Sequence, residues 1–158
     1  SGNGTSIHLA GHLFEQAAGV KLSHIPYKGS SQAHLDLIAG NIDAVLVHGA
    51  GRAGKPPAFC AGGDICFFHQ AALSGNPALE DFFTEEYALN HLIHGYPKPY
   101  IAWMDGICMG GGMGIAQGAS HRVVTEHSKL AMPETNIGLF PDVGGGFFLG
   151  QCPGHTGE

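Results

Sequence analysis

The chain has 158 residues, of which 44% are hydrophobic and 13% are charged, and its formal net charge is −6. A chain of this length can bury enough apolar surface for one globular domain. The acidic balance argues against a nucleic-acid partner, and no apolar run reaches the roughly 18 residues of a membrane span. Without a basic-then-apolar signal at the N-terminus, we expect a cytoplasmic protein.

The four cysteines form no CxxC pair and have no zinc-site spacing. We therefore expect reduced thiols, as in other cytoplasmic proteins. Among the eleven histidines, His8 and His12 have the i, i+4 spacing of helical metal ligands, and His91 and His94 lie three residues apart. No acidic third ligand lies at a suitable offset, so we predict no metal site.

Residues 1–47 predict four short elements that alternate between helix and strand. The helices are indicated by Ser or Thr caps, by apolar residues on one helical face and by a terminal glycine. The strands are indicated by alternation or by a short apolar run, and the order favours parallel pairing. In chain order, the four elements are expected at residues 5–18, 20–27, 31–39 and 42–47.

Three phrases in this segment, HLAGHLFEQAAGV, HIPYKG and DLIAGNIDA, carry a resemblance to a known family. The segment is similar to part of the periplasmic substrate-binding receptors of tripartite tricarboxylate transporters. The resemblance implies that the turn at Thr5 and Ser6 helps to bind a carboxylate ligand. It also implies that the other lobe of such a receptor is absent from this chain.

The middle of the chain predicts a loop, a glycine-rich turn, a long helix and a strand. Residues 49–57 are loop-like, and Asp64 after the turn is expected to cap the next segment, although residues 67–79 are only loop-like or weakly helical. Residues 79–92 predict an amphipathic helix anchored by aromatic and leucine side chains. Two prolines then precede a strand at residues 100–104.

The stretch from residue 105 to residue 146 holds two glycine triplets with two carboxylates, Glu134 and Asp142, between them. A glycine triplet after an apolar strand lets the backbone approach a ligand closely. If a helix starts near Met113, the amides of residues 110–112 lie at its N-terminus, where they can stabilise an oxyanion. Further short strands are expected at residues 123–125 and 129–131.

The motifs FCAGGD, GGG and PETNIGLFPDVGGG, in that order, resemble the crotonase (enoyl-CoA hydratase/isomerase) superfamily. Within it, the chain is most similar to the 3-hydroxyisobutyryl-CoA hydrolase branch, over about residues 48–150. The resemblance implies an α/β fold: a truncated spiral of ββα units preceded by a foreign α-β-α-β segment. We expect a receptor-like segment at residues 1–47, packed into the same domain as a partial crotonase-like region at residues 48–158, so that the chain is an apparent chimera.

The resemblance also assigns roles to individual residues. In the hydrolase branch the glutamate attacks the substrate or activates water, and the aspartate assists it. The substrate is a coenzyme A thioester, and no separate cofactor is implied. The implied residues are Glu134 and Asp142 for catalysis, Gly63 and Gly111 for the oxyanion hole, and Glu86, Gly62 and Gly110 for substrate binding.

Two departures from the hydratases favour hydrolysis. Hydratases carry a second catalytic glutamate two positions after the glycine triplet, where this chain has Gly114. They also lack an acid at the position of Asp142. Simpler readings remain open: Glu134 as an acid at a helix start, Asp142 as a turn residue and Glu86 as a solvated helix carboxylate.

Several functions therefore remain in competition. The first is an acyl-CoA thioester hydrolase. The others are a folded but catalytically inert chimeric oligomer, a binding module for a small carboxylate, and an enoyl-CoA hydratase or isomerase. Because the family's C-terminal helices are not in this sequence, we expect a homo-oligomer that covers the apolar residues Phe147, Phe148 and Leu149.

Overall fold

A computed structural model of the chain describes residues 12, 15–16, 19–25, 27, 35–36, 39–51 and 54–154. The chain divides into two compact units, Ser1–Leu46 and Val47–Glu158. Thr5 and Ser6, which form the predicted ligand-binding turn, lie outside the described residues. His8, one member of the His8 and His12 pair, also lies outside them. The described part contains no helix that is long and apolar enough to cross a membrane.

In the first unit, the described residues agree with both predicted helices. His12, Glu15 and Gln16 are helical, as are Leu35 and Asp36. A glycine follows each helical segment with a left-handed backbone, Gly19 at φ 66° and Gly40 at φ 80°. Glycine adopts this conformation without a steric penalty, which is why it commonly ends helices.

The strand predicted at residues 20–27 is not formed. Residues 20–25 and 27 belong to no strand, and residues 20–25 are exposed. Their amides turn back to the preceding helix: Val20 donates to the Glu15 carbonyl over 3.2 Å, and Leu22 donates to Glu15 Oε1 over 2.6 Å. The prediction was wrong because alternating apolar residues favour a strand only where the segment pairs in a sheet and buries one face. Residues 20–25 lie in no sheet and are exposed.

Within the part of the chain that the structure describes, six strands form two three-stranded sheets. One sheet has the order β1-β3-β5 and the other has the order β2-β4-β6. The pairs β3–β5, β2–β4 and β4–β6 are parallel. The strands are β1 (Val45–His48), β2 (Ala58–Cys60), β3 (Tyr100–Met104), β4 (Ile107–Met109), β5 (His121–Val124) and β6 (Lys129–Ala131).

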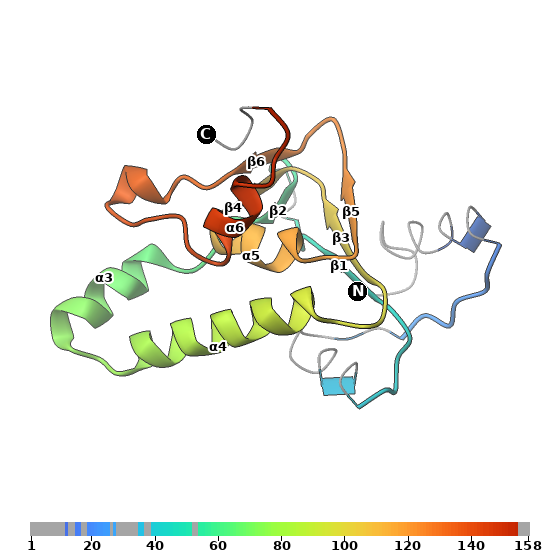
Figure 1. Ribbon diagram of the computed structural model, residues 1–158, viewed down its shortest axis with the longest axis horizontal. Helices are drawn as coiled ribbons and strands as arrows, with labels where there is room; N and C mark the ends of the chain where they lie inside the picture. Colours follow the sequence, from blue (N-terminus) through green and yellow to red (C-terminus); the bar gives the residue numbers. More distant parts are fainter. Residues whose placement is uncertain are drawn as a thin grey trace. The chain divides into compact units, whose positions relative to one another are not determined.

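In chain order the strands come in twos, β1 with β2, β3 with β4 and β5 with β6, and each two strands are followed by one or two helical segments. They are α3 (Ile65–Ser74), α4 (Ala78–His94), α5 (Gly111–Gln117), the 3-10 helix η1 (Glu134–Ile137) and α6 (Gly145–Leu149). The chain therefore repeats a strand–strand–helix unit three times, with one strand of each unit in each sheet. This repeat confirms the predicted α/β spiral of ββα units (Figure 1).

Residues 67–79 were expected to be loop-like or weakly helical, and the structure has them helical as far as Ser74, where α3 ends. Asp64 caps α3 as predicted, because its Oδ1 accepts from the amides of Cys66 at 2.9 Å and Phe67 at 3.3 Å. Gly75 ends the helix with a left-handed backbone at φ 63°. The sequence predicted the cap. It did not show the ring contacts between α3 and α4, in which Phe68 packs against Phe82 and Phe83.

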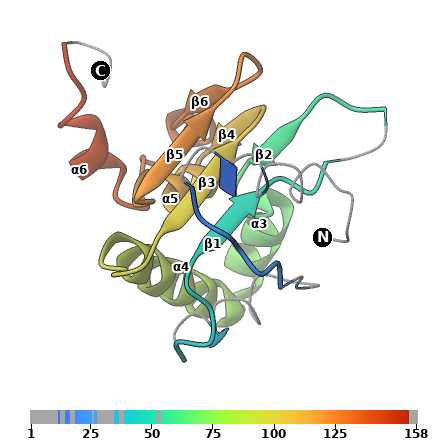
Figure 2. The same ribbon diagram turned by 90° about the vertical axis from the view of Figure 1, so that its right-hand side faces the viewer.

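The core of the second unit lies around α5, which packs between the strands and α4 (Figure 1). Figure 2 turns the strands of both sheets toward the reader. The tight approach of α5 depends on small residues, because a side chain at Gly112 would collide with the Cys60 carbonyl. The buried residues from the strands and α5 include Tyr100, Ala102, Met104, Cys108, Met113 and Ala116.

Candidate active site

Two glycine turns meet at one edge of the second sheet. The first joins β2 to α3 and the second joins β4 to α5, and β2 and β4 are parallel neighbours. Gly62 has φ +93°, and a Cβ on it would lie 3.0 Å from the Gly111 nitrogen and 3.6 Å from the Met109 oxygen. The fold therefore brings together the two turns that carry the predicted glycines.

Both predicted oxyanion-hole amides belong to these turns. Gly63 is packed against aromatic side chains, because a Cβ there would lie 3.1 Å from Cζ of Phe82. Gly111 is the first residue of α5, where amides have no partner within the helix. Among the described residues, no backbone carbonyl accepts from the Gly63 amide or the Gly111 amide. Both amides are available to an oxygen atom of a ligand.

Glu134 is the buried polar residue of this unit, with 7% of its surface exposed. It begins η1, three residues after β6. Its Oε1 lies 3.0 Å from the place that a Cβ on Gly110 would take, so the carboxylate rests against the second glycine turn. Its Oε2 is buried and has no hydrogen-bond partner among the described residues. A buried carboxylate oxygen without a partner is costly and is typical of a functional group.

The neighbouring apolar side chains do not account for this burial. Ile137 and Leu139, which the sequence places near Glu134, are 52% and 47% exposed, and Phe140 is 72% exposed. These three side chains therefore point largely to solvent and do not cover the carboxylate. The carboxylate is instead enclosed by the glycine turn against which it lies.

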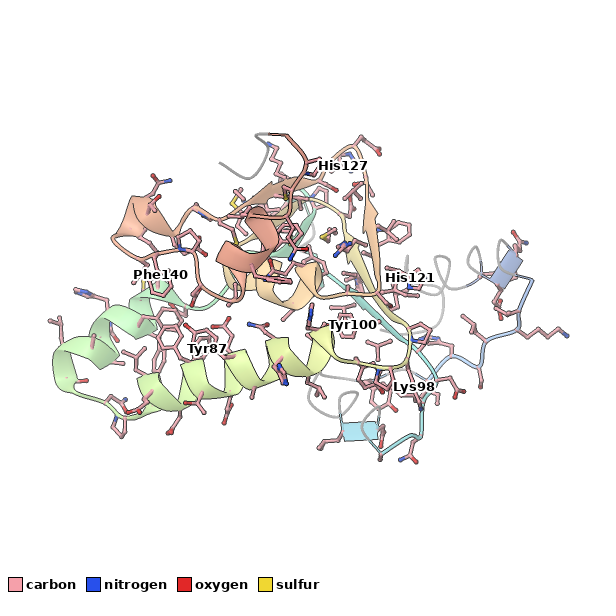
Figure 3. The ribbon with its side chains drawn as sticks, viewed as in Figure 1. Tyr87, Lys98, Tyr100, His121, His127 and Phe140 are labelled. Atoms are coloured by element: carbon pink, nitrogen blue, oxygen red, sulfur yellow. The ribbon has the colours of Figure 1, made fainter. Side chains whose placement is uncertain are left out.

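Asp142 is only partly buried and is held by a tyrosine. Its Oδ2 accepts a hydrogen bond of 2.7 Å from the hydroxyl of Tyr87 on α4, and Figure 3 labels that tyrosine. The next residue, Val143, has φ 42° and is buried. A β-branched residue in the left-handed region is strained, and such strain is frequent at functional sites.

Glu86 also comes from α4 and reaches the second glycine turn. A Cβ on Gly111 would collide with its Oε1. Partial burial raises the pKa of the Glu86 carboxyl, and the nearby charge of Asp142 raises it further. The structure therefore brings Glu86, Gly111 and Asp142 into one neighbourhood, which continues through Gly110 to Glu134.

Tyr87 was not predicted to belong to this site. The sequence pattern makes it an apolar anchor of the helix, but 43% of its surface is exposed and its hydroxyl is bonded to Asp142. Its position beside Glu86 was the available signal. No spacing rule connects it with an acid 55 residues later in the chain.

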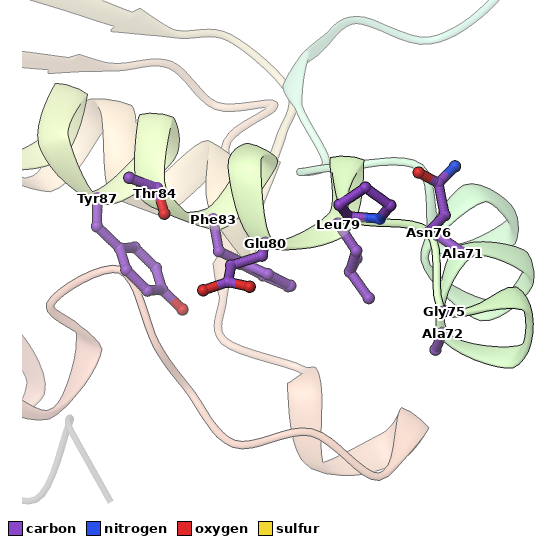
Figure 4. A pocket seen from close by; sticks show the side chains of 10 residues that line it. Ala71, Ala72, Gly75, Asn76, Leu79, Glu80, Phe83, Thr84 and Tyr87 are labelled. Atoms are coloured by element: carbon purple, nitrogen blue, oxygen red, sulfur yellow. The ribbon is translucent and has the colours of Figure 1, made fainter.

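A pocket of about 650 Å³ opens between α3 and α4. Figure 4 shows Tyr87 at one end and Ala71 and Ala72 at the other. Neither Glu134 nor the glycine turns line this pocket. Of the residues that line the pocket, Tyr87 is therefore the one that is bonded to Asp142.

Metal ligands are not grouped in the described residues. No three His, Cys, Asp or Glu side chains lie together in a way that could hold an ion. The four cysteines are free thiols. Two acids of the site, Glu86 and Glu134, lie against the second glycine turn, and the third, Asp142, is bonded to a tyrosine hydroxyl. Carboxylates next to such a turn suit proton transfer at a carbonyl held there.

Solved structures share this fold. A carnitinyl-CoA dehydratase from Mycobacterium thermoresistibile matches with a TM-score of 0.69 and 43% identity, and an enoyl-CoA hydratase from Rhodobacter sphaeroides matches with 0.70 and 40%. Each match covers 80% of this chain and 37% of the solved chain. The likeness therefore extends over most of this chain but only a part of each relative.

Curated relatives match a similar share of the chain. The 3-hydroxyisobutyryl-CoA hydrolase of Xenopus tropicalis is 53% identical over 113 residues, which are 72% of this chain and 28% of the relative. The small ribosomal subunit protein mS47 of Neurospora crassa is 45% identical over 118 residues, covering 73% of this chain and 22% of that protein. The chain thus spans less than a third of the length of these relatives.

Two family models match the chain. The model of the tripartite tricarboxylate transporter family receptor matches residues 1–53, in agreement with the resemblance of the N-terminal segment. The model of enoyl-CoA hydratase/isomerase matches residues 35–158, which is most of the chain and begins earlier than the sequence motifs indicated. The chain belongs to the enoyl-CoA hydratase/isomerase family.

Proposed function

We propose that the chain carries the reacting groups of an acyl-CoA thioester hydrolase of the 3-hydroxyisobutyryl-CoA hydrolase type. The observation that carries this proposal is the position of Glu134. Its carboxylate is buried against Gly110, the residue before Gly111, and one of its oxygens has no partner among the described residues. A carboxylate in such a place can act on a group held at the turn.

In the proposed reaction, the thioester carbonyl lies between the amides of Gly63 and Gly111. Glu134 either attacks the carbonyl carbon or takes a proton from the attacking water. The carbonyl oxygen becomes an oxyanion that both amides stabilise, and each such donor contributes about 3 kcal/mol. The carbon–sulfur bond then breaks and the coenzyme A thiolate leaves and takes up a proton, with Asp142 assisting. When water is the attacking group, this step gives the free acid directly. When Glu134 is the attacking group, it leaves a mixed anhydride on Glu134, and a water molecule then hydrolyses the anhydride to the free acid and restores the carboxylate.

Gly114 supports hydrolysis over hydration. This residue is buried, and a Cβ on it would lie 2.7 Å from Cβ of Val143 and 2.9 Å from Oδ1 of Asn90. The position that carries the second acid of hydratases therefore has no room for a side chain. The second acid here is Asp142, which comes from the turn before α6 and is held by Tyr87.

The main alternative is a folded protein without catalysis. The mS47 relative matches nearly the same share of the chain as the hydrolase relatives, and its name is that of a ribosomal subunit protein. Family membership alone therefore does not assign an activity to this chain. The carboxylate-binding alternative depends on Thr5 and Ser6, which lie outside the described residues.

We also infer that the chain forms a homo-oligomer. Phe147 on α6 is 65% exposed, and its ring is in edge-to-face contact with His94 at 5.9 Å. Exposed aromatic surface of this kind favours association with a second copy. Light scattering at micromolar concentration should give a mass above that of one chain, and a Phe147→Ser variant should shift toward the single-chain mass. A wild-type mass equal to one chain would contradict the inference.

The compartment remains a prediction. The hydrolase relatives carry the word mitochondrial in their names, whereas the sequence features led us to expect a cytoplasmic protein. Fractionation of the source cells with an antibody against this chain would decide between the two.

The experiment for the proposed function separates hydrolysis from hydration. The purified chain is given a branched 3-hydroxyacyl-CoA and, separately, an enoyl-CoA. We expect release of free thiol from the first and no loss of enoyl absorbance with the second. Loss of enoyl absorbance without thiol release would favour a hydratase, and no change with either substrate would favour the inert alternative.

A further inference from the structure

We propose that Tyr87 is the positioning residue of Asp142: its hydroxyl fixes one carboxylate oxygen and leaves the other for water or substrate. This inference rests on the proposed function, because it gives Asp142 an orientation that assists hydrolysis. It adds Tyr87 of α4 to the residues that hold the two acids proposed for catalysis, Glu134 and Asp142, which both follow β6.

The ring of Tyr87 is held by a row of aromatic side chains. Its centroid is 5.9 Å from that of Phe83 on the same helix. Phe83 in turn contacts Phe68 on α3 at 5.2 Å, and Phe68 contacts Phe82 at 4.9 Å. Because tilted and edge-to-face ring contacts restrict side-chain rotation, the hydroxyl is presented in a defined direction. There it donates to Oδ2 of Asp142 over 2.7 Å.

The other side of Asp142 is fixed by the backbone. Val143 is 4% exposed and adopts φ 42°, a strained conformation for a β-branched residue. The Nε2 of Gln117 on α5 donates to the Val143 carbonyl. Strain persists only where the surrounding contacts enforce it. Asp142 is therefore held by α4 through its side chain and by α5 through the following residue.

The electrostatic setting keeps Tyr87 a donor. Burial raises the pKa of its phenol, and the hydrogen bond to Asp142 and the charges of Asp142 and Glu86 raise it further. Glu80 is another acidic residue that lines the adjoining pocket. Because burial and the charges of Asp142 and Glu86 disfavour a phenolate, the hydroxyl keeps its proton at neutral pH. A permanent donor on one oxygen orients the carboxylate.

The kinetic test uses Tyr87→Phe, which removes the hydroxyl and keeps the ring. We expect kcat for thioester hydrolysis to fall about tenfold or more, as for the loss of a hydrogen bond to a charged group, with little change in KM. Tyr27→Phe is the matched control, because it removes a similar bond of 2.8 Å to Asp36 in the first unit. The control should leave kcat unchanged.

A double variant shows whether Tyr87 acts through Asp142. If it does, Tyr87→Phe combined with Asp142→Asn should be no slower than Asp142→Asn alone, because the two losses are not additive within one unit. A tyrosine that only stabilised α4 would give losses that multiply. Full kcat in Tyr87→Phe, or multiplied losses, would overturn the inference while leaving the hydrolase proposal in place.

A readout without turnover makes the two proposals separable. Tyrosine labelled with ¹³C at Cζ reports phenol titration by NMR, and the Tyr87 signal is identified by its absence in Tyr87→Phe. Asp142→Asn should lower the pKa of Tyr87 toward the ordinary value of about 10, and Tyr27→Phe should not. An unchanged Tyr87 titration in Asp142→Asn would overturn the inference even if the chain proved inactive. An inactive wild type would overturn only the hydrolase proposal.

Discussion

The glycine turns and the acid-bearing segment from η1 to α6 are built in opposite ways. In the turns, backbone atoms lie close to the place that a Cβ would take at Gly62 and at Gly112, and the Glu86 carboxylate lies at that place on Gly111. In the acid-bearing segment, residues 135–140 are exposed, and the two acids are located by contacts with other segments. Glu134 lies against Gly110, and Asp142 is bonded to Tyr87. The turns thus set a rigid frame, while each acid depends on a specific partner.

This contrast predicts that the largest loss of turnover comes from the turns. Gly62→Ala would place a methyl group 3.0 Å from the Gly111 nitrogen and obstruct that oxyanion donor. We expect kcat to fall about 100-fold to 1,000-fold, the usual effect of losing one donor. Thioester turnover by the folded variant measures it.

The control for backbone strain is Gly75→Ala. Gly75 has φ +63° and would meet no atom within 4 Å, so its substitution costs about 1–2 kcal/mol of strain without touching the site. It should lower the unfolding midpoint and leave kcat unchanged. Equal kcat values for Gly62→Ala and Gly75→Ala would show that the turn is not an oxyanion site.

A smaller loss is expected from Asp142→Asn. The amide keeps the shape of the side chain and removes its charge, so only the assisting role is lost. We expect kcat to fall about tenfold to 100-fold, less than for Glu134→Gln. Steady-state kinetics of the two variants on one thioester will order them. A larger loss for Asp142→Asn would exchange the proposed roles of the two acids.

The smallest effect concerns the pH dependence of stability at Glu86. Its pKa is raised by burial and by Asp142, so its favourable contribution is complete below the ordinary value of about 4.3 and is lost as pH rises through the raised pKa. Relative to wild type, Glu86→Gln should therefore gain stability between pH 4 and pH 7. Denaturant unfolding at both values measures this, with exposed Glu85→Gln as the control.

Much of the second unit could be predicted from the sequence because its signals are local. The strands at Tyr100–Met104 and Lys129–Ala131 have the predicted bounds, and Asp64 caps a helix as expected. The strand at residues 20–27 failed because its alternation has no pairing partner, and β1 begins at Val45 rather than at residue 42. Pairing is a property of two segments, so one segment alone does not reveal it.

The site shows the same division. Gly62, Gly110 and Glu134 were found through motifs, and the fold brings them together. Tyr87 was missed because its bond to Asp142 joins residues far apart in the chain. The burial of Glu134 could not be predicted from its neighbours in sequence either, because Ile137 and Leu139 are exposed. The motifs identify the candidate residues of this site. The residues that hold them in place, such as Tyr87, can be found only from the structure.

The most direct test of the central claim is thiol release by wild type and by Glu134→Gln from one branched 3-hydroxyacyl-CoA, with circular dichroism showing that both are folded. The amide keeps the shape of the glutamate but can act neither as a nucleophile nor as a base. The account predicts that wild type releases thiol above the uncatalysed rate and that Glu134→Gln falls at least about 100-fold below wild type. Equal background rates for two folded proteins would contradict it.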